Sequence, residues 1–415
     1  MRRSEAMRVL LAPDGFGGLL SPHAAAEAMA DGWRTAAPHD DVVVSPLADG
    51  GPGFLATVQA SIGGRLLPCV VRGPWREAVA ASVLLVDEPV GLTAYVESAQ
   101  ANGLALVAAD HRDPTRTTSL GVGDLLRHAR AAGARRVVVG LGGSGTVDGG
   151  AGMLAGLGLA DVAGRLAGGG GGLDRLTDDD LAGLAALRAG WADVEVVVAC
   201  DVDVPLLGLQ GAAAGFAPQK GATPEQAQHL ERALAQFARL AGSALGEVER
   251  PNLLAQPVAF SHVREGAPAP TGRSGGDRLA ALPGAGAAGG LGFGLALLGG
   301  RLVPGAAVVA DAVGLDRSLA ASDIVVTGEG RFDWQSLHGK VVAEVAQRAL
   351  AHGVPTVVVA GEVLVGRREQ AAEGISAAYA VSETPEQVAV ALADPAGTLT
   401  ARTAAVARTW SPPPR

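Results

Sequence analysis

Apolar runs that end on an acidic residue, often beside glycine, recur along this chain. They include RVLLAPDGF, DVVVSPLADGG, RRVVVGLGGSGTVDGG, VEVVVACDVDVP and SDIVVTGEG. Each run begins with a short apolar stretch that is typical of a buried strand, and helical patterns follow several of them. Strands that alternate with helices predict a parallel sheet, and ligands bind such sheets at the carboxyl ends of the strands. We therefore expect an α/β protein whose functional residues follow its strands.

The starts of several helices can be read from capping signals. Ser21 is expected to be an N-cap, with Pro22 at the first helical position. The segment Thr223 to Gln226 reads Thr-Pro-Glu-Gln, a capping box, and the same four residue types recur from Thr384. Hydrophobic residues make up 48% of the chain but aromatic residues only 3%. Small aliphatic residues therefore fill the core, which suits close packing of helices on a sheet.

The alternation of strands and helices is interrupted between about residues 65 and 100, where several short strands follow one another. Clean alternation returns after residue 284. The simplest organisation is a Rossmann-like parallel-sheet domain formed by both chain ends, over residues 7–72 plus 284–410. A second α/β domain, over residues 73–283, is inserted between its two parts.

Composition excludes several classes of function. The net charge of −9 and the lack of a basic stripe argue against nucleic acid and against an anionic membrane surface. The two cysteines, Cys69 and Cys200, form neither a disulfide framework nor a zinc motif. The chain shows no signal peptide and no apolar run of about 18 residues. We therefore expect a soluble, cytoplasmic protein.

Two glycine-rich segments are candidates for binding an anion. In LGGSGTVDGG, which follows an apolar run, Gly142, Gly143, Ser144 and Gly145 expose backbone N–H groups, and Asp148 stands among the glycines. Gly284, Gly286 and Gly289 form a similar segment. Both segments also fit the dinucleotide pattern G-x-G-x-x-G, although the first lacks the expected downstream strand and acid. Tight strand-to-helix turns are the alternative interpretation, and a Walker A motif is absent.

Acidic residues at or just past the ends of predicted strands form the second candidate group. They are Asp14, Asp49, Asp148, Asp201, Asp203, Glu329 and Asp333. Singly, each could cap a helix. Together with anion-binding glycine loops, they favour phosphoryl transfer, in which carboxylates hold Mg²⁺ or accept a proton from a hydroxyl group.

Cationic candidates are few, because the chain has just two lysines, Lys220 and Lys340. Lys220 lies in a polar, glycine-flanked loop. Lys340 lies near the start of a predicted helix, where a cation is unfavourable for the helix dipole and a ligand-facing role is plausible. Arg331, between Glu329 and Asp333, could bind a carboxylate through two hydrogen bonds or could pair with its neighbours.

The motifs in their order along the chain resemble those of the type-1 glycerate kinase family. They are APDGFGG, ADGGPGF, TTSLGVGDLL, GLGGSGTVDGGAGML, VACDVDVPLLG, GAAAGFAPQKGAT, PGAGAAGGLGFGL and TGEGRFDWQSLHGK. The resemblance spans about residues 8–395. It implies a Rossmann-like domain with an inserted α/β domain, and phosphorylation of D-glycerate by ATP and Mg²⁺, usually to 2-phosphoglycerate.

This chain departs from the family pattern at a few positions. Gly17 stands where the family usually has a lysine, Pro52 where it has a glutamate, and Phe54 where it has a threonine. Val147 replaces an asparagine. Such changes could compensate one another, alter the substrate or remove activity.

From the residues and the resemblance together, we expect an ATP-dependent kinase for D-glycerate. Asp201 is predicted to be the base, and Lys220 and Arg331 to meet the substrate carboxylate or the transferred phosphoryl group. Substrate and phosphate contacts are predicted for Asp14, Lys340, Asp148 and the two glycine segments, and Mg²⁺ contacts for Asp49, Asp203 and Glu329. A homodimer is left open. A nicotinamide-dependent hydroxy-acid oxidoreductase and a non-catalytic sensor of glycerate or nucleotide are the alternatives.

Overall fold

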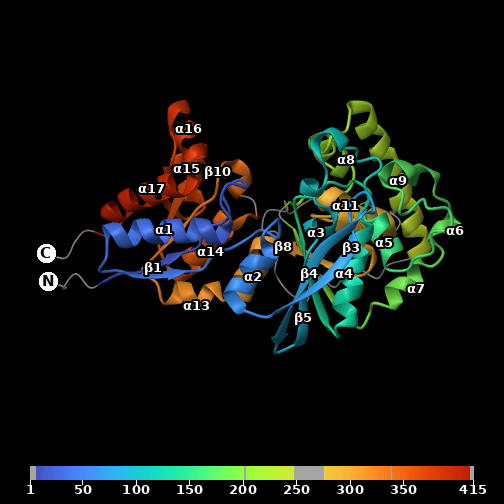
Figure 1. Ribbon diagram of the computed structural model, residues 1–415, viewed down its shortest axis with the longest axis horizontal. Coiled ribbons are helices and arrows are strands. Elements are labelled where there is room, and N and C mark those ends of the chain that lie inside the picture. The colour runs from blue at the N-terminus through green and yellow to red at the C-terminus, as the bar shows by residue number, and fades with distance from the viewer. Residues whose placement is uncertain (1–5, 201, 247–274, 338, 412–415) are drawn as a thin grey trace. The chain divides into compact units, whose positions relative to one another are not determined.

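The chain divides into two units, the first of which contains both chain ends (Figure 1). The computed structural model describes residues 6–200, 202–246, 275–337 and 339–411. The first unit comprises Met1–Asp49, Ala56–Gly63 and Ala306–Arg415, and the second comprises Gly50–Leu55 and Gly64–Gly305. The expected α/β fold, with one domain inserted into another, is confirmed.

The first unit is built on a five-stranded sheet with the strand order β13-β11-β9-β1-β2. Every pairing in this sheet is parallel. Its strands are β1 (Arg8–Leu11), β2 (Asp41–Val44), β9 (Ile324–Thr327), β11 (Thr356–Ala360) and β13 (Ile375–Ala380). The carboxyl ends of three neighbouring strands, β9, β1 and β2, therefore lie at the same edge.

Helices cover both faces of this sheet because its central strands are apolar on both sides. Val357 and Val359 of β11 belong to the cluster that also contains Trp33 of α1 (Pro22–Ala36). Val358 belongs to the cluster on the other face, with Val342 of α14 (Val341–His352). A strand buried on both faces reads as a continuous apolar run, which is what TVVVA shows.

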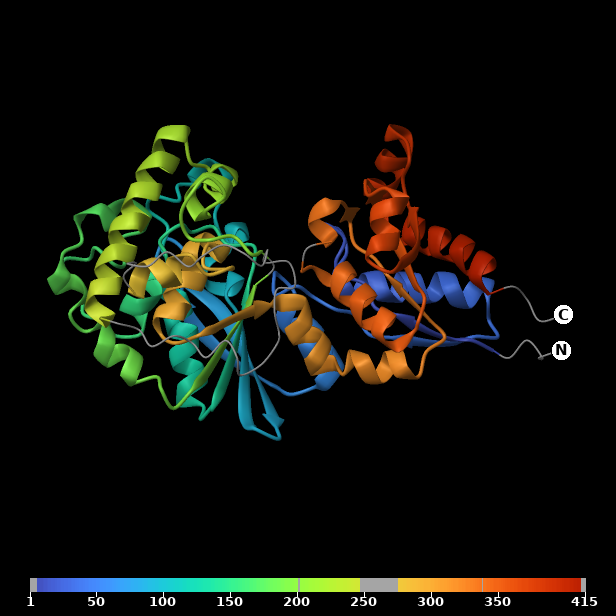
Figure 2. The ribbon, with the colours of Figure 1, turned by 180° about the vertical axis from the view of Figure 1, so that it is seen from behind.

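Helices α1 and α17 (Pro395–Trp410) come from opposite ends of the chain and lie side by side in both views (Figures 1 and 2). A Cβ atom on Gly32 would lie 2.3 Å from the carbonyl oxygen of Thr400, so glycine is required for this close approach. The hydroxyl group of Thr400 in turn donates to the carbonyl oxygen of Ala28 at 2.9 Å. The Ser21 cap and Pro22 start of α1 are confirmed.

The second unit contains a six-stranded mixed sheet with the order β3-β4-β5-β6-β7-β8. The strands β3 (Arg65–Arg72), β4 (Ala78–Glu88) and β5 (Gly91–Glu97) form an antiparallel meander. The pairings from β5 through β6 (Arg136–Leu141) and β7 (Glu195–Cys200) to β8 (Arg301–Pro304) are parallel. The short strands expected between residues 65 and 100 are this meander.

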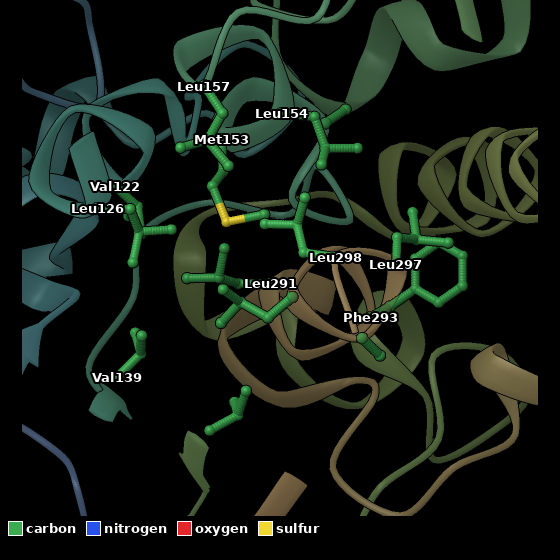
Figure 3. Packing of buried hydrophobic residues seen from close by; sticks show 14 of the residues in the cluster. Val122, Leu126, Val139, Met153, Leu154, Leu157, Leu291, Phe293, Leu297 and Leu298 are labelled. Atoms are coloured by element: carbon green, nitrogen blue, oxygen red, sulfur yellow. The ribbon is translucent and has the colours of Figure 1, made fainter. Parts of the chain in front are cut away.

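The core of the second unit packs around α11 (Ala287–Leu297), a helix buried on all sides. Figure 3 shows Leu291, Phe293 and Leu297 of this helix among side chains of the preceding helices, with Met153 pointing toward Leu298. Glycines permit this depth: a Cβ atom on Gly294 would lie 2.8 Å from the Cα atom of Gly150. Helix α11 therefore packs directly against the segment that follows β6.

The remaining elements complete the two units. Those assigned mainly to the first unit are α2 (Phe54–Ile62), α12 (Gly305–Val313), α13 (Leu315–Ala320), β10 (Arg331–Phe332), η5 (Trp334–Leu337), β12 (Glu362–Val363), α15 (Arg367–Ala372) and α16 (Pro385–Ala393). Those of the second are α3 (Ala99–Asn102), η1 (Leu104–Leu106), η2 (Ala109–His111), α4 (Leu120–Ala131), α5 (Ala151–Gly156), η3 (Gly170–Arg175), α6 (Asp178–Leu181), α7 (Leu184–Ala189), α8 (Ala212–Phe216), η4 (Pro218–Lys220), α9 (Pro224–Leu245) and α10 (Gly275–Ala280). The Thr223 capping box at the start of α9 is confirmed.

Among the helices in the described ranges, none has both the length and the hydrophobicity to cross a bilayer.

The predicted domain boundaries differ from those of the two units. β3 was expected in the domain of the chain ends, but it pairs along its whole length with β4 and so belongs to the second unit. Residues 284–305 also belong to the second unit, because α11 fills its core and β8 pairs with β7. Strand pairing between distant segments decided both cases, and the local pattern does not reveal such pairing.

Candidate active site

The predicted anion loop leaves β6 and enters α5 with its backbone packed tightly against neighbouring chain. A Cβ atom on Gly142 would lie 2.5 Å from the Cα atom of Gly51, so the position is closed to other residues. Gly143 adopts a φ of +62°, in the left-handed region that favours glycine. The N–H group of Leu104 donates to the carbonyl oxygen of Gly143 at 2.8 Å and fixes the turn. The sequence therefore places bare, oriented backbone at the carboxyl end of a strand.

Lys220 is the buried cation of this site. Its side chain comes from η4, and the residue is only 3% exposed. Its Nζ atom donates to the Oγ atom of Ser144 and to the carbonyl oxygen of Thr146, each at 2.8 Å. A buried ammonium is costly unless hydrogen bonds compensate the loss of water. Here those bonds hold the charge against the anion loop.

The second glycine segment packs onto the first. Ala288, Gly289 and Gly290 adopt successive left-handed conformations with φ of 52°, 71° and 87°. A Cβ atom on Gly289 would lie 1.9 Å from the carbonyl oxygen of Thr146. The N–H group of Gly149 donates to the carbonyl oxygen of Gly289 at 3.0 Å. Successive backbone N–H groups in such turns form concavities that bind anions.

The two segments and Lys220 line one cavity of about 220 Å³ in the second unit. The predicted residues that line it are Gly142, Gly143, Ser144, Lys220, Gly286 and Gly289. Apolar side chains of Leu104, Val202 and Phe216 complete part of its wall. A buried cation facing glycine-rich backbone in a small cavity suits a carboxylate or a phosphate group.

Three further predicted contact residues brace the loops, and their contact with a ligand stays a prediction. The N–H group of Gly145 donates to the carbonyl oxygen of Asn102 at 2.7 Å. Gly284 packs against the side chain of Cys200. Asp148 is fully buried, and its carboxylate accepts hydrogen bonds from the N–H and the hydroxyl group of Ser119 at 2.8 and 2.9 Å.

Asp148 also accepts from the N–H groups of Gly150 and Gly152, which lie at the entrance to α5. Burial raises the pKa of Asp148, while the hydrogen bonds from Ser119 and the two glycines oppose that rise. With both oxygens engaged inside the protein, the carboxylate fixes the exit of the loop.

The first unit carries a separate group of carboxylates. Asp14 follows β1, Asp49 follows β2, and Glu329 follows β9, so the three come from the neighbouring strands of one parallel edge. Lys340, the residue before α14, lies close enough to influence both Asp14 and Glu329 electrostatically. The sequence-based expectation that these acids belong at strand ends is met here because parallel strands share their carboxyl edge.

Mutual repulsion and burial shape the protonation of this group. Burial, followed by the neighbouring Asp49 carboxylate, raises the pKa of Asp14 well above its ordinary value. Burial raises the pKa of Glu329 to about 7, and the carboxylates of Asp333 and Asp49 add to this effect. The Ser336 hydroxyl and the Lys340 ammonium act in the opposite direction on Glu329. A positive charge placed near these carboxylates would therefore favour their ionised forms.

The donors of this group fit a magnesium ion. The Oε1 atom of Glu329 is buried and has no hydrogen-bond partner among the residues that the structure describes. Over the described part of the chain, no three Asp, Glu, His or Cys side chains are grouped so as to hold a metal by themselves. Mg²⁺ usually takes only one or two protein carboxylates and completes its shell with substrate phosphates and water. Asp49 and Glu329 can supply that number, while Asp203 is an exposed residue of the second unit.

Arg331 and Asp201 are the other two residues that were predicted to be catalytic. Arg331 in β10 is exposed, and its Nε atom lies 3.7 Å from the carboxylate of Asp333 and 3.9 Å from that of Glu362, both long ion pairs. Its predicted contact with substrate stays a prediction. Asp201, the predicted base, lies outside the described residues.

Several residues that build these sites were not predicted from the sequence. Ser336 is 1% exposed and its hydroxyl group bonds to Glu329, which orients that carboxylate. Asn102 donates from Nδ2 to the Thr146 hydroxyl at 3.2 Å and braces the loop beneath Lys220. Glu97 ends β5 and accepts from the N–H groups of Gly53 and Leu55. Glu97 carries the same signal as the other acids, since it ends an apolar strand; the other two residues carry no such signal.

The positions that depart from the family pattern have distinct settings. Val147 is fully buried and Phe54 packs its ring against Tyr95, so both serve the core of the second unit. Pro52 is exposed and lies against the loop at Gly143. Gly17 has a φ of +57° and open space around it, a conformation that other residues adopt at a cost.

Comparisons with known proteins agree with the geometry. The model of the glycerate kinase family matches residues 9–411. The chain is 38% identical over 381 residues to a protein of Escherichia coli K12 named glycerate 2-kinase, covering 90% of each. It is 38% identical over 380 residues to one of Bacillus subtilis 168 named glycerate kinase, again covering 90% of each.

A solved structure is also similar. The crystal structure named for glycerate kinase 2 from Salmonella typhimurium LT2 matches with a TM-score of 0.71 and 35% identity, covering 97% of this chain and 98% of that one. An uncharacterized protein of Mycobacterium tuberculosis is 40% identical over 401 residues, covering 95% of this chain and 89% of its own. The kinase interpretation is thus favoured over the oxidoreductase alternative.

Proposed function

Because this chain belongs to the glycerate kinase family and is a glycerate kinase, we propose that it transfers the terminal phosphoryl group of ATP to D-glycerate and releases 2-phosphoglycerate. The observation that carries this proposal is the cavity in which buried Lys220 faces two glycine-rich loops. Oriented donors and a fixed cation stabilise phosphoryl transfer with little rearrangement. We further propose that the enzyme works in the cytoplasm.

The transfer has simple requirements for bonds and protons. The oxygen of the C2 hydroxyl group attacks the terminal phosphorus, the bond to the bridging oxygen breaks, and ADP leaves. The hydroxyl proton must go to a base, and a carboxylate is the usual base in kinases. Asp201 follows β7 in sequence, directly after the buried strand VVVAC, and we assign it this role.

The cavity of the second unit supports the binding of an anionic group. Its Lys220 ammonium is already held by Ser144 and Thr146, so it needs no reorganisation when the ligand enters. The backbone of Gly142–Ser144 and of residues 286–289 supplies further donors. Glycerate carries a carboxylate and becomes a phosphate ester, and either group suits this set of donors.

The carboxylate group of the first unit supports nucleotide binding through a metal ion. Asp49 and Glu329 would hold Mg²⁺, which neutralises charge on the phosphates when bound. Ser336 orients Glu329 and keeps one of its oxygens engaged. Lys340 adds positive charge beside the same carboxylates. That charge would also attract the phosphate groups of a bound nucleotide.

The test is the release of ADP from ATP and Mg²⁺ with D-glycerate as acceptor. L-glycerate, tartronate and the absence of an acceptor are the controls, and phosphorus NMR distinguishes the 2-phospho from the 3-phospho product. We expect ADP release that depends on D-glycerate, with the phosphate on C2. Binding of ATP without turnover on any acceptor would overturn the proposal and favour a sensor.

A further inference from the structure

A short segment at the end of α3 runs antiparallel to the anion loop and is bonded to it through the backbone. The N–H group of Gly145 donates to the carbonyl oxygen of Asn102 at 2.7 Å. Gly103 and Ser144 form an antiparallel bridge next to this bond. Since α3 follows β5, and β5 pairs with β6, the order of the strands brings this segment to the loop that follows β6.

The side chain of Asn102 adds a further bond to the loop. Asn102 and Thr146 are both fully buried, and the Nδ2 atom of Asn102 donates to the Oγ1 atom of Thr146 at 3.2 Å. Lys220 donates from Nζ to the carbonyl oxygen of that same Thr146 and to the hydroxyl group of Ser144. Asn102 therefore holds one of the two residues that bind Lys220, and the adjacent Gly103 holds the other.

The amide of Asn102 is only partly satisfied. Its Oδ1 atom is buried and has no hydrogen-bond partner among the residues that the structure describes. A buried polar atom without a partner lowers stability, and a small apolar residue at this position would avoid that cost. Polar groups that are kept in a core at such a cost are typical of functional sites. The position of the amide beside the anion loop indicates which site it serves.

We propose that Asn102 is a positioning residue of the kinase reaction, which acts through Thr146 on the ammonium group of Lys220. The proposal rests on the role proposed for Lys220, and it adds the group that fixes where this charge lies. A charge stabilises a reacting group only when it is held at the right place, and a small displacement is enough to slow the reaction.

Two substitutions break the bond from its opposite sides. Asn102→Ala removes the amide, whereas Thr146→Val removes the hydroxyl group but keeps the carbonyl oxygen that binds Lys220. Each should lower kcat/KM for D-glycerate about tenfold, the scale of one neutral hydrogen bond. Thr146→Ser keeps the hydroxyl group and should restore most of the loss. Wild-type kcat/KM in Thr146→Val would overturn the proposal, and this variant carries the test if Asn102→Ala does not fold.

The Lys220→Met background distinguishes positioning from a general structural role. If Asn102 acts through Lys220, Asn102→Ala and Thr146→Val should lower kcat/KM in the otherwise wild-type protein but not in Lys220→Met. Equal losses in both backgrounds would overturn the proposal, because the bond would then act independently of the ammonium group. Wild-type turnover by Lys220→Met would instead overturn the role proposed for Lys220.

Thr93→Val is the matched control for Thr146→Val. Thr93 is also fully buried, and its hydroxyl group donates to the Oε2 atom of Glu88 at 2.8 Å. It pairs with Arg136 at the start of β6, whereas the anion loop follows the end of that strand. Both variants should lower the thermal midpoint to a similar extent, but only Thr146→Val should lose activity. An equal loss of activity in Thr93→Val would assign the effect to general destabilisation and overturn the proposal.

Discussion

The Nζ atom of Lys220 lies 2.8 Å from the Oγ atom of Ser144, although 76 positions separate the two residues in sequence. Ser144 belongs to the loop after β6, whereas Lys220 closes η4. The contact joins the cation to the backbone donors of the cavity, so that charge and N–H groups act on one ligand. The predictions below begin from this pair.

Replacing Lys220 by methionine should leave the protein folded and nearly inactive. Methionine keeps the length of the side chain but removes the charge, and kcat/KM for D-glycerate should fall roughly 10²–10³-fold, as for loss of one preorganised donor. Steady-state ADP release measures this loss. Arg239→Met, on the exposed surface of α9 in the same unit, should keep full activity. Wild-type turnover by Lys220→Met would remove the ammonium from the proposed chemistry.

Gly289→Ala should disrupt the cavity by steric overlap. Its Cβ atom would lie 1.9 Å from the carbonyl oxygen of Thr146, which also accepts from Lys220. Gly314→Ala is the matched control, because Gly314 has a φ of +70°, close to the +71° of Gly289, but open space around it. The control should cost about 1 kcal/mol from backbone strain alone, and Gly289→Ala several times more. Chemical denaturation measures both, and equal costs would contradict the packing described.

Glu329 should make stability depend on pH when magnesium and nucleotide are absent. Its pKa is raised from 4.5 to about 7 in the folded protein, so the folded state keeps a proton that the unfolded chain releases. The contribution of this group to the free energy of unfolding therefore falls as the pH rises from about 4.5 to 7. Glu329→Gln removes this effect and should gain stability over the wild type, on the order of 2–3 kcal/mol at pH 8.

Urea denaturation at pH 5, 6, 7 and 8 measures that difference. Glu27→Gln, at an exposed position on α1, is the control and should follow the wild type at every pH. If the free energies of Glu329→Gln and wild type change in parallel, Glu329 does not titrate in this range. Added Mg²⁺ should stabilise the wild type more than Glu329→Gln, because Mg²⁺ binds the ionised carboxylate of Glu329 and the variant lacks that carboxylate.

Asp201→Asn should separate binding from chemistry. An amide of the same shape cannot accept the hydroxyl proton, so kcat should fall by about 10²–10⁴-fold, the usual contribution of general base catalysis. The affinity for ATP, measured by calorimetry, should change little. Asp203→Asn is the neighbouring control for the loss of one negative charge. Unchanged turnover of Asp201→Asn would remove Asp201 as the base.

Much of the first unit could be predicted because its signals are local. Asp14, Asp49 and Glu329 each follow an apolar strand, and parallel pairing brings such positions to one edge. In the second unit, the glycine-rich loop at Gly142–Gly145 was predicted from its backbone N–H groups to bind an anion, and Lys220 was singled out by its polar, glycine-flanked loop. The cavity brings Lys220 together with Gly142, Gly143 and Ser144.

The remaining features depend on long-range packing. Asp148 carries the same sequence signal as Asp14, yet it turns inward to Ser119, and the direction of a loop side chain cannot be read from its neighbours in sequence. Ala288 adopts a left-handed conformation that its residue type does not suggest, because α11 is forced against the loop. β8 joined the second unit for a similar reason, since its partner β7 lies about a hundred residues upstream.

The side-by-side packing of α1 and α17 has a consequence for synthesis on the ribosome. Strand β1 cannot complete its pairing in the sheet until β9 has been synthesised. The N–H group of Arg8 likewise donates to the carboxylate of Asp323, 315 positions downstream. The first unit is therefore completed only when the last helix emerges, whereas the second unit, nearly continuous from Gly64 to Gly305, can form while the ribosome is still translating. Premature termination within α17 should release a folded second unit attached to an unfinished sheet, which proteases would recognise.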